Sequence, residues 1–288
     1  MTAIALTRAG PLTTLQDAGR FGMLAHGISA SGPMDRGAYL AAGAALERAG
    51  ETAIEFSQGL EFEADGDIRF GVAGGDSKLW INGAAAAWTG ALTLKSGDRI
   101  AIAPGAWGNY GYLRFDREID VPALLGSRST NVTVGLGGFK GRALKAGDRL
   151  GLGAMGQPVA AAVVPTAEGP IRVIWGLHAD LFDNAVRQRF VEQGFFISTN
   201  LDRMGVRLTD PVGVFDEQRK LNLVSDSIVP GDIQILGDGT PIVLMRDHQP
   251  TGGYPRIATV VSADFDRFAQ LRPGTEVRFR PVTLEHTR

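Results

Sequence analysis

The sequence predicts a mainly β protein that carries a few helices and divides into two subdomains. Glycine accounts for 39 of the 288 residues, about twice its usual share, and is spread along the chain as turn punctuation. The segments GDRIAIA (97–103) and TEVRFRPV (275–282) each follow a tight turn and alternate apolar with polar residues, as half-buried strands do. These observations favour barrel-like or sandwich-like β domains.

Three helices are expected among the strands. The first covers residues 34–49, which are rich in alanine, and Asp35 and Gly50 match the usual start and stop signals. The second covers residues 179–193, where apolar residues fall at helical spacing and a glycine follows. A third, shorter helix is expected over residues 264–271.

The segment 153–170, GAMGQPVAAAVVPTAEGP, differs from its surroundings because it is small, dotted with proline and glycine, and nearly uncharged. Such a composition is typical of a linker between domains. We therefore predict two subdomains, residues 1–160 and residues 165–288.

Charge and cysteine content exclude several classes of protein. The 29 basic residues against 31 acidic residues give a net charge of −2, which creates no long-range field to attract nucleic acid or an anionic membrane. The absence of cysteine excludes disulfides and thiol nucleophiles. The N-terminus lacks the pattern of a signal peptide, and no apolar run is long enough to span a bilayer. We expect a cytoplasmic protein with neither a nucleic-acid partner nor a membrane partner.

The most informative stretch surrounds the polar quartet 246–249 (RDHQ). The apolar residues 241–245 (PIVLM) precede it and are typical of a core strand, so the quartet lies where a strand leaves a core. The turn 251–254 (TGGY) follows, and its glycine pair permits a close approach of the backbone to a ligand. Polar side chains mounted on a rigid strand and a tight turn are typical of a binding site.

A second candidate is the polar, glycine-rich segment 10–35, which carries Gln16, Arg20, Ser31 and Asp35. Apolar residues along the segment anchor it, which disfavours disorder. A long ordered loop within a compact chain usually has a function, so we predict a ligand-binding role for this one. The alternative for Asp35 is to cap the first helix.

Two further clusters have the composition of anion sites. In 202–208, Arg203 and Arg207 lie four residues apart across a glycine and can converge on one anion, although surface or salt-bridged arginines are the plainer interpretation. In 125–130 (LGSRST), the hydroxyl groups around Arg128 resemble a nest for an oxyanion or a phosphate.

Several familiar motifs are absent. The segment 135–142 (GLGGFKGR) lacks the ending of a Walker A loop, so the chain has no P-loop of its own. The four histidines are far apart and no metal-binding spacing occurs, so no metal site is expected. No lysine lies in the context that carries attached biotin, and no Gly-x-Ser-x-Gly elbow supports a serine hydrolase triad.

Five segments resemble one family, in the same order along the chain. They are GPLTTLQDAGRFG with GISASGPMD, LGSRST, GGFKGRALKAGDRL, DRMGVRL, and SDSIVPGDIQILGDGTPIVLMRDHQPTGGYPRIATV. On these segments the sequence is identified as a member of the 5-oxoprolinase C-subunit family. This family is also called allophanate hydrolase subunit 2 or KipA-like, within the biotin-dependent carboxyltransferase group. The resemblance covers nearly the whole chain.

The resemblance implies a cyclophilin-like β-barrel architecture, with a carboxyltransferase-type subdomain over 1–160 and a cyclophilin-like barrel over 165–288. It also implies partners. Proteins of this kind pair with a KipI-like B-type subunit and, together with an A-type subunit, hydrolyse 5-oxo-L-proline to L-glutamate with ATP. ATP is then a cofactor of the complex, and the lone chain is expected to be inactive.

Two alternatives follow from other relatives. One is a component of a urea- or allophanate-type biotin-dependent carboxyltransferase, which would need a separate biotin carrier. The other is a non-catalytic KipA-like regulatory protein that binds a KipI-like partner. Fold alone does not choose among the three functions.

The implied reaction assigns roles to the candidate residues. Opening a stable lactam needs cations for developing oxyanions, a base for water, and donors for the substrate. We expect Arg203 and Arg246 to hold anionic groups and Asp247 to act as the catalytic base. The expected substrate-binding residues, from both halves of the chain, are His248, Gln249, Tyr254, Gln16, Arg20, Ser31, Asp35 and Arg128. An exposed apolar patch is expected where a partner docks.

Overall fold

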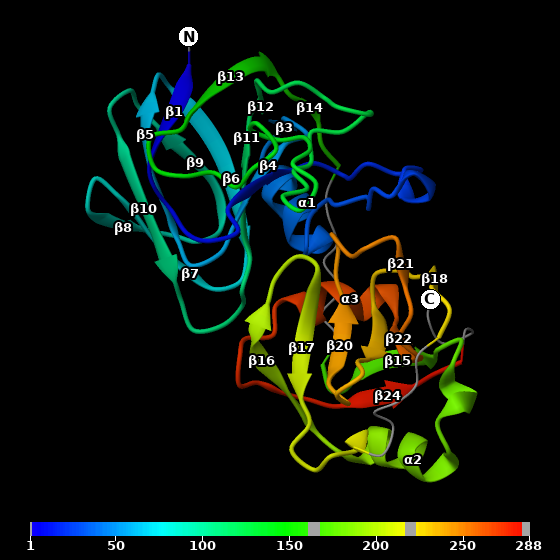
Figure 1. Cartoon of the computed structure of the whole chain (residues 1–288). Helices are drawn as coiled ribbons and strands as arrows, with labels where there is room; N and C mark the ends of the chain where they lie inside the picture. The colour runs from blue at the N-terminus through cyan, green and yellow to red at the C-terminus, as the bar shows by residue number, and fades with distance from the viewer. Residues whose placement is uncertain (1, 161–167, 217–222, 284–288) are drawn as a thin grey trace. The chain divides into compact units, whose positions relative to one another are not determined.

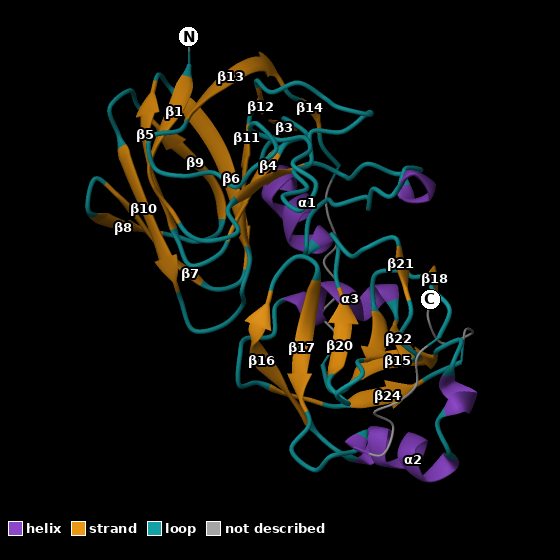
Figure 2. Ribbon diagram, viewed as in Figure 1, coloured by secondary structure: helices purple, strands orange, loops and turns teal. Residues whose placement is uncertain are grey.

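The computed structural model describes residues 2–160, 168–216 and 223–283, and the chain forms two compact units (Figure 1). The first unit comprises Met1–Gly22 and Ala30–Pro165, and the second comprises Met23–Ser29 and Thr166–Arg288. Each unit is built mainly of strands, which confirms the predicted class (Figure 2).

Two sheets form most of the first unit, with strand orders β12-β13-β1-β5-β10-β7-β8 and β2-β4-β11-β6-β9. The strands of the larger sheet are β1 (Ala3–Ala9), β5 (Leu60–Asp65), β7 (Ser77–Ile81), β8 (Ala84–Ala86), β10 (Arg99–Pro104), β12 (Arg117–Ile119) and β13 (Arg149–Met155). The strands of the smaller sheet are β2 (Thr14–Gln16), β4 (Ala53–Phe56), β6 (Ile68–Gly74), β9 (Gly90–Leu94) and β11 (Gly111–Phe115). A short separate pair joins β3 (Arg48–Ala49) to β14 (Gln157–Pro158).

The core of the first unit is shared by the two sheets. On β5, Leu60, Phe62 and Ala64 are buried and the residues between them are half-buried, which is the period of two of a strand with one face in a core. Phe62 packs edge-on against Phe70 of β6 and Phe115 of β11, with ring centroids 6.2 and 6.5 Å apart. These aromatic contacts tie one sheet to the other.

Helix α1 (Arg36–Ala44) packs against β6 and β11. The carboxylate of Asp35 accepts a hydrogen bond from Ala38 N at 2.8 Å, which confirms the helix-capping alternative for this residue. The helix ends at Ala44 and not at residue 49. The reason is that Arg48–Ala49 pairs with β14 as a strand.

One sheet of eight strands dominates the second unit, in the order β23-β16-β17-β20-β19-β22-β15-β24. Its strands are β15 (Ile171–Trp175), β16 (Phe195–Leu201), β17 (Gly205–Thr209), β19 (Asp232–Ile235), β20 (Pro241–Leu244), β22 (Arg256–Val260), β23 (Glu276–Val277) and β24 (Phe279–Pro281). Arg278 alone separates the two end strands of this order, so the sheet curls into a nearly closed barrel. A separate two-stranded ribbon pairs β18 (Asp226–Ser227) with β21 (Thr251–Gly252).

Aromatic side chains fill one end of this barrel. Phe190 of helix α2 (Asn184–Glu192) stacks on Phe279 with ring centroids 5.1 Å apart, and both contact Phe195. Helix α2 is therefore attached to the barrel by aromatic packing.

The second predicted helix, 179–193, is two elements. A 3₁₀ turn at Ala179–Leu181 precedes α2, and Asp183 between them accepts a hydrogen bond from Val186 N at 2.8 Å. A capping residue requires extended backbone, which interrupts the helix. The third predicted helix is present as α3 (Ser262–Ala269), two residues earlier than expected.

The predicted linker, 153–170, is strand in its first part, because Gly153–Met155 completes β13 and Gln157–Pro158 forms β14. Residues 161–167 of that linker lie outside the described residues. The loop predicted over 10–35 contains the strand β2 and a 3₁₀ helix at Leu24–His26. Across the described ranges, no helix combines the length and apolar content needed to cross a membrane.

Gly71 of β6 gives a test of how closely α1 approaches the sheet. A Cβ atom at Gly71 would collide with the carbonyl oxygen of Ala42 in α1. We expect Gly71→Ala to lower the free energy of unfolding by about 2 kcal/mol, because the helix must move away from the strand. Urea denaturation measures the change. Gly151→Ala in β13 is the matched control, since the nearest atom to its Cβ would lie 3.6 Å away. Equal losses in the two variants would contradict the tight contact.

Candidate functional site

The polar quartet of the second unit follows a core strand, as predicted. Val243, Leu244 and Met245 are at most 1% exposed. The backbone N–H of Asp247 donates to the carbonyl of Arg203 at 2.7 Å. This hydrogen bond ties the chain beyond β20 to the turn between β16 and β17.

Arg203 and Asp247 form a buried ion pair with two hydrogen bonds. Arg203 Nε donates to Asp247 Oδ2 at 2.9 Å and Nη2 donates to Oδ1 at 3.1 Å. The two side chains are only 4% and 2% exposed. Both carboxylate oxygens are therefore occupied by the guanidinium, and each charge depends on the other for its stabilisation. Two of the predicted catalytic residues are thus brought together.

His248 is the next residue, and it is buried in its neutral form. Its Nδ1 lies 2.6 Å from the carbonyl oxygen of Gln249, so the neutral ring carries its proton on Nδ1. Burial lowers the pKa of His248, and the Gln249 carbonyl with the carboxylates of Asp232 and Asp247 only partly opposes this. The other ring nitrogen, Nε2, is then a hydrogen-bond acceptor with the chemistry of a general base.

Arg246 has different surroundings from Asp247, although the two are adjacent in the chain. Its guanidinium carbon lies 4.4 Å from the ring centroid of Phe265, and Nη2 lies 3.4 Å from Asp266 Oδ1. With Phe265 it lines a cavity of about 450 Å³. The structure therefore does not place Arg246 in the ion pair with Asp247. Of the remaining predicted residues here, Gln249 is half-buried and Tyr254 is exposed.

In the first unit, the carboxylate of Asp17 organises the segment 125–130. Ser127 and Ser129 each donate a hydroxyl hydrogen bond to Oδ1 at 2.6 Å, and Arg128 N donates to Oδ2 at 2.5 Å. Burial raises the pKa of Asp17, but these hydrogen bonds outweigh burial and keep the pKa below its usual value. The two serine hydroxyls of the predicted nest are thus turned to a carboxylate of the chain itself and not to an external oxyanion.

Arg20 and Arg128 donate to backbone carbonyls near that segment. Arg20 Nε donates to Leu124 O at 2.9 Å and Nη2 donates to Ser129 O at 2.9 Å. Arg128 Nε donates to Val121 O at 3.0 Å. These hydrogen bonds hold the loop in one shape, so both arginines position the backbone around Asp17.

Gln16 is bonded to the same segment and uses both ends of its amide. Its Nε2 donates to Thr14 Oγ1 at 2.9 Å and to Thr130 O at 3.0 Å, and its Oε1 accepts from Gly32 N at 3.0 Å. Gln16 therefore fixes the chain that follows Ser31 against β2.

Ser31 differs from these residues because its side chain is unsatisfied. Its φ angle of 56° lies in the left-handed region, which is costly for any residue except glycine. The residue is buried, and its Oγ has no hydrogen-bond partner within the described ranges. Strain and an unpaired buried hydroxyl both cost stability, a combination typical of positions under functional constraint.

A buried carboxylate on β4 was not among the predicted site residues. Glu55 is fully buried, and its Oε2 accepts from Tyr112 Oη at 2.7 Å and from Met34 N at 2.8 Å. Tyr112 Oη in turn accepts from Asp35 N at 2.8 Å. Burial and the Glu55 charge raise the pKa of Tyr112 well above its usual value. The available signal was a glutamate inside the otherwise apolar run 53–56 (AIEF).

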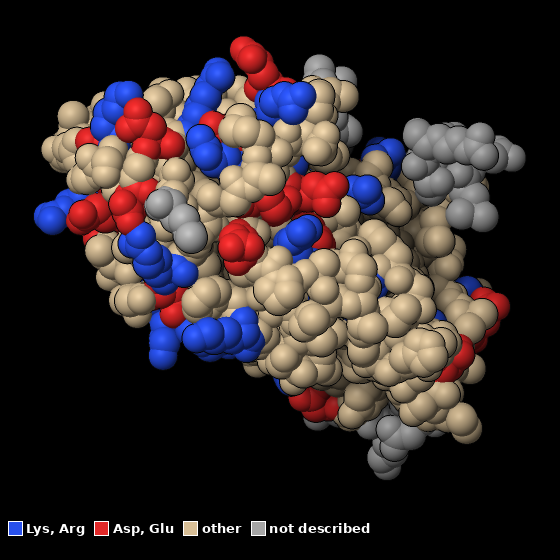
Figure 3. Space-filling model, turned by 90° about the horizontal axis from the view of Figure 1, so that it is seen from above, with Lys and Arg blue, Asp and Glu red and all other residues tan. Residues whose placement is uncertain are grey.

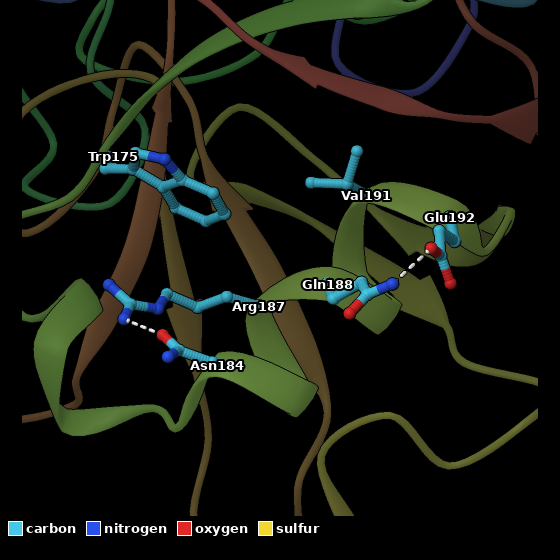
Figure 4. Close-up of a pocket in the computed structure, with 6 residues that line it drawn as sticks. All are labelled: Trp175, Asn184, Arg187, Gln188, Val191 and Glu192. Carbon is cyan, nitrogen blue, oxygen red and sulfur yellow. Dashed lines mark hydrogen bonds between the residues drawn. The ribbon is translucent and has the colours of Figure 1, made fainter.

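A separate cavity of about 380 Å³ lies beside α2 (Figure 4). Its polar side chains bond to near neighbours in the chain: Arg187 donates to Asn184, and Gln188 donates to Glu192 at 2.8 Å. None of the residues predicted to form a site lines this cavity. In the parts of the chain that the structure describes, no group of three His, Asp or Glu residues is placed to hold a metal ion.

The chain matches the family model for the carboxyltransferase domain, subdomain A and B, over residues 26–281. It is similar to the 5-oxoprolinase C subunit of Escherichia coli K12, with 36% identity over 97% of this chain and 91% of the relative. The protein of the same name from Haemophilus influenzae shares 32% identity, over 94% of this chain and 89% of the relative.

A solved structure resembles the whole chain. The crystal structure of the K. lactis urea amidolyase superimposes with a TM-score of 0.88 and 28% identity over 99% of this chain. The present chain corresponds to only 19% of that longer protein.

Because the Arg203–Asp247 pair is buried, we expect replacement of one partner to destabilise the protein more than replacement of both. We expect Arg203→Met to lower the free energy of unfolding by about 4 kcal/mol, because Asp247 would stay buried without a counter-ion. The double variant Arg203→Met/Asp247→Leu should recover most of this loss in urea denaturation. Arg8→Met is the control, because its pair with Glu61 is half exposed and is worth less than about 1 kcal/mol. Additive losses in the double variant would rule out coupling between the two charges.

We expect the lowered pKa of His248 to make the free energy of unfolding fall toward acid pH. Its folded-state pKa is lowered, and the unfolded value is about 6.5. As the pH falls below about 6.5, His248 takes up a proton in the unfolded chain before it does so in the folded chain. The free energy of unfolding therefore decreases until the pH has passed below the folded-state pKa. His248→Asn should remove this contribution from thermal unfolding measured between about pH 7.5 and 5. In a proton NMR titration of the native protein, a His248 pKa at or above about 6.5 would contradict the assignment.

Proposed function

The chain belongs to the carboxyltransferase domain family, subdomain A and B, and from this we propose that it is the C subunit of an ATP-dependent 5-oxoprolinase. The proposed reaction hydrolyses 5-oxo-L-proline to L-glutamate within a heteromeric complex. Two relatives of that name, each matched along almost its entire length at more than 30% identity, support this assignment. The need for ATP favours the cytoplasm as the location of the proposed enzyme.

The proposed chemistry begins with transfer of the γ-phosphoryl group of ATP to the lactam oxygen, which releases ADP. Water then adds to the activated carbonyl carbon, the ring C–N bond breaks, and inorganic phosphate leaves to give glutamate. ATP is supplied through the complex, because the sequence of this chain contains no Walker A ending. The part assigned to this chain is therefore binding the lactam and activating water.

The observation that carries this proposal is the neutral His248 beside the Arg203–Asp247 pair. Both oxygens of Asp247 already accept from Arg203, so the carboxylate is occupied by the guanidinium. We assign the base to His248 Nε2 and give the ion pair the role of holding the backbone that carries it.

The proposed partners are a KipI-like B-type subunit and an A-type subunit of the 5-oxoprolinase. Exposed apolar side chains support a docking surface in the first unit, because Phe21, Leu125 and Val134 each expose more than half of their surface. Figure 3 shows acidic and basic side chains intermixed on the displayed face, without a dominant sign of charge. An interface without a dominant charge suits a permanent complex.

A biotin-dependent carboxyltransferase component is the second candidate, favoured by the similarity to urea amidolyase. That relation is more distant than the one to the 5-oxoprolinase proteins, at 28% against 36% identity. A KipA-like regulator remains the third candidate.

One experiment discriminates among the three functions. Glutamate release from 5-oxoproline and ATP is measured with the A-type and B-type partners, with and without this chain. A requirement for this chain supports the hydrolase. Tight binding to the B-type partner without any release would support the regulator.

Two variants test the assigned base in the reconstituted complex. We expect His248→Gln to lower kcat by about 100-fold or more, because the water would lose its proton acceptor. Asp65→Asn is the control, since Asp65 belongs to an exposed pair with Arg149 on a sheet of the first unit. A rate for His248→Gln within about threefold of the native rate would refute the assignment of His248 as the base.

A further inference from the structure

Gln234 on β19 is a buried residue whose amide nitrogen is unsatisfied within the described ranges. It is 1% exposed, and its Nε2 has no partner among the described residues. Its Oε1 makes no hydrogen bond within the described ranges and is not among their fully buried unpartnered atoms. An amide N–H buried without a partner destabilises a fold, so its retention calls for a function.

The neighbouring polar groups of the barrel are satisfied, which isolates Gln234. Asp232, two residues earlier on the same face of β19, accepts from Thr259 Oγ1 at 2.6 Å and from Arg256 Nη1 at 3.4 Å. Arg256 is the register partner of Gln234 and also donates to Ser227 O at 2.7 Å. On this face of β19, Asp232 and Arg256 are hydrogen-bonded to each other and to their neighbours, and the Gln234 carboxamide takes no part in that network.

A thin layer of backbone covers this carboxamide. A Cβ atom at Gly252 would collide with Gln234 Nε2, so a larger residue there would displace the end of the Gln234 side chain. Gly252 belongs to the β18–β21 ribbon, which contains only two residue pairs. Arg256 secures the ribbon through Asp226 at 2.7 Å. Ribbons this short have little stability of their own, and a glycine pair offers little resistance to movement.

The free edge of a carboxamide has a specific complement. It presents one donor, Nε2, and one acceptor, Oε1, side by side. A ring amide held in the cis form presents the matching acceptor and donor on one edge, so two parallel hydrogen bonds form, as between glutamine and adenine. Lactams and ureido rings share this edge, whereas a simple cyclic amine lacks it.

We propose that Gln234 binds the cis-amide edge of a lactam or ureido ring, which enters where the segment 251–253, including β21, moves aside. This inference rests on the proposed function for its lactam form, in which Gln234 orients 5-oxoproline for attack. The ligand offsets the cost of the buried amide by completing its hydrogen bonds. The residue is then a specificity determinant of the site that begins at the end of β20.

Gln234→Met separates this role from a structural one by two measurements on the full chain. Replacement of an unsatisfied amide by an apolar side chain of similar shape should raise the thermal midpoint by about 3 °C. Gln16→Met is the matched comparison, because Gln16 is equally buried but makes three hydrogen bonds. It should lower the midpoint. A fall in the midpoint with Gln234→Met, similar to that of Gln16→Met, would overturn the inference.

The second measurement is ligand binding by calorimetric titration with 5-oxoproline, biotinamide and proline. We expect native chain to bind 5-oxoproline or biotinamide, and Gln234→Met to weaken that binding about 30-fold through loss of two hydrogen bonds. Proline, which lacks the ring carbonyl, should not bind. Gly252→Ala should weaken binding too, because its Cβ displaces the amide, whereas Gly237→Ala is the control with its nearest atom 3.9 Å away.

The outcomes distinguish this inference from the proposed function. Binding of biotinamide that depends on Gln234, in a complex that releases no glutamate, would uphold the inference and refute the hydrolase. Binding of neither ring by the native chain, or equal binding by native chain and Gln234→Met, would overturn the inference whatever the activity of the complex.

Discussion

A buried charge has to be stabilised inside the protein, and the pair of Arg203 with Asp247 shows how strongly this constrains the second unit. The two side chains meet through two hydrogen bonds, and the backbone N–H of Asp247 donates to the carbonyl of Arg203. Together these contacts join the end of β20 to the β16–β17 turn. The path of the chain through His248 follows from that junction, because neither charge can be moved away from the other without a large loss of stability.

In the first unit, a buried carboxylate is stabilised by hydrogen bonds in place of an ion pair. The carboxylate of Asp17 is satisfied by Ser127 and Ser129, which lie more than 100 residues further along the chain. Arg20 holds the same loop by donating hydrogen bonds to two backbone carbonyl groups of the loop. The Ser31 hydroxyl and Gln234 Nε2 are among the buried polar atoms of the described ranges that have no hydrogen-bond partner, and such exceptions are where ligands can complete a structure.

The sequence predicted the local features well, for physical reasons that operate over a few residues. The core strand before the quartet and the cap at Asp35 both depend on neighbours within one or two turns of chain. The same kind of signal was available at Asp183, whose capping role divides the second predicted helix. The linker prediction went too far at its start, because strand pairing in residues 153–158 overrode their small, loop-like composition.

By itself the sequence determined the mainly β class, the position of the polar quartet and the resemblance to one family, since periodicity, turn residues and motifs are properties of short segments. Only the tertiary structure decided which polar side chains meet. Arg246 and Asp247 are adjacent in the chain, yet one lies over Phe265 and the other pairs with Arg203. Both residues lie in the turn that follows β20, where His248 N donates to Met245 O at 3.3 Å, and what each side chain meets there depends on segments that are distant in sequence.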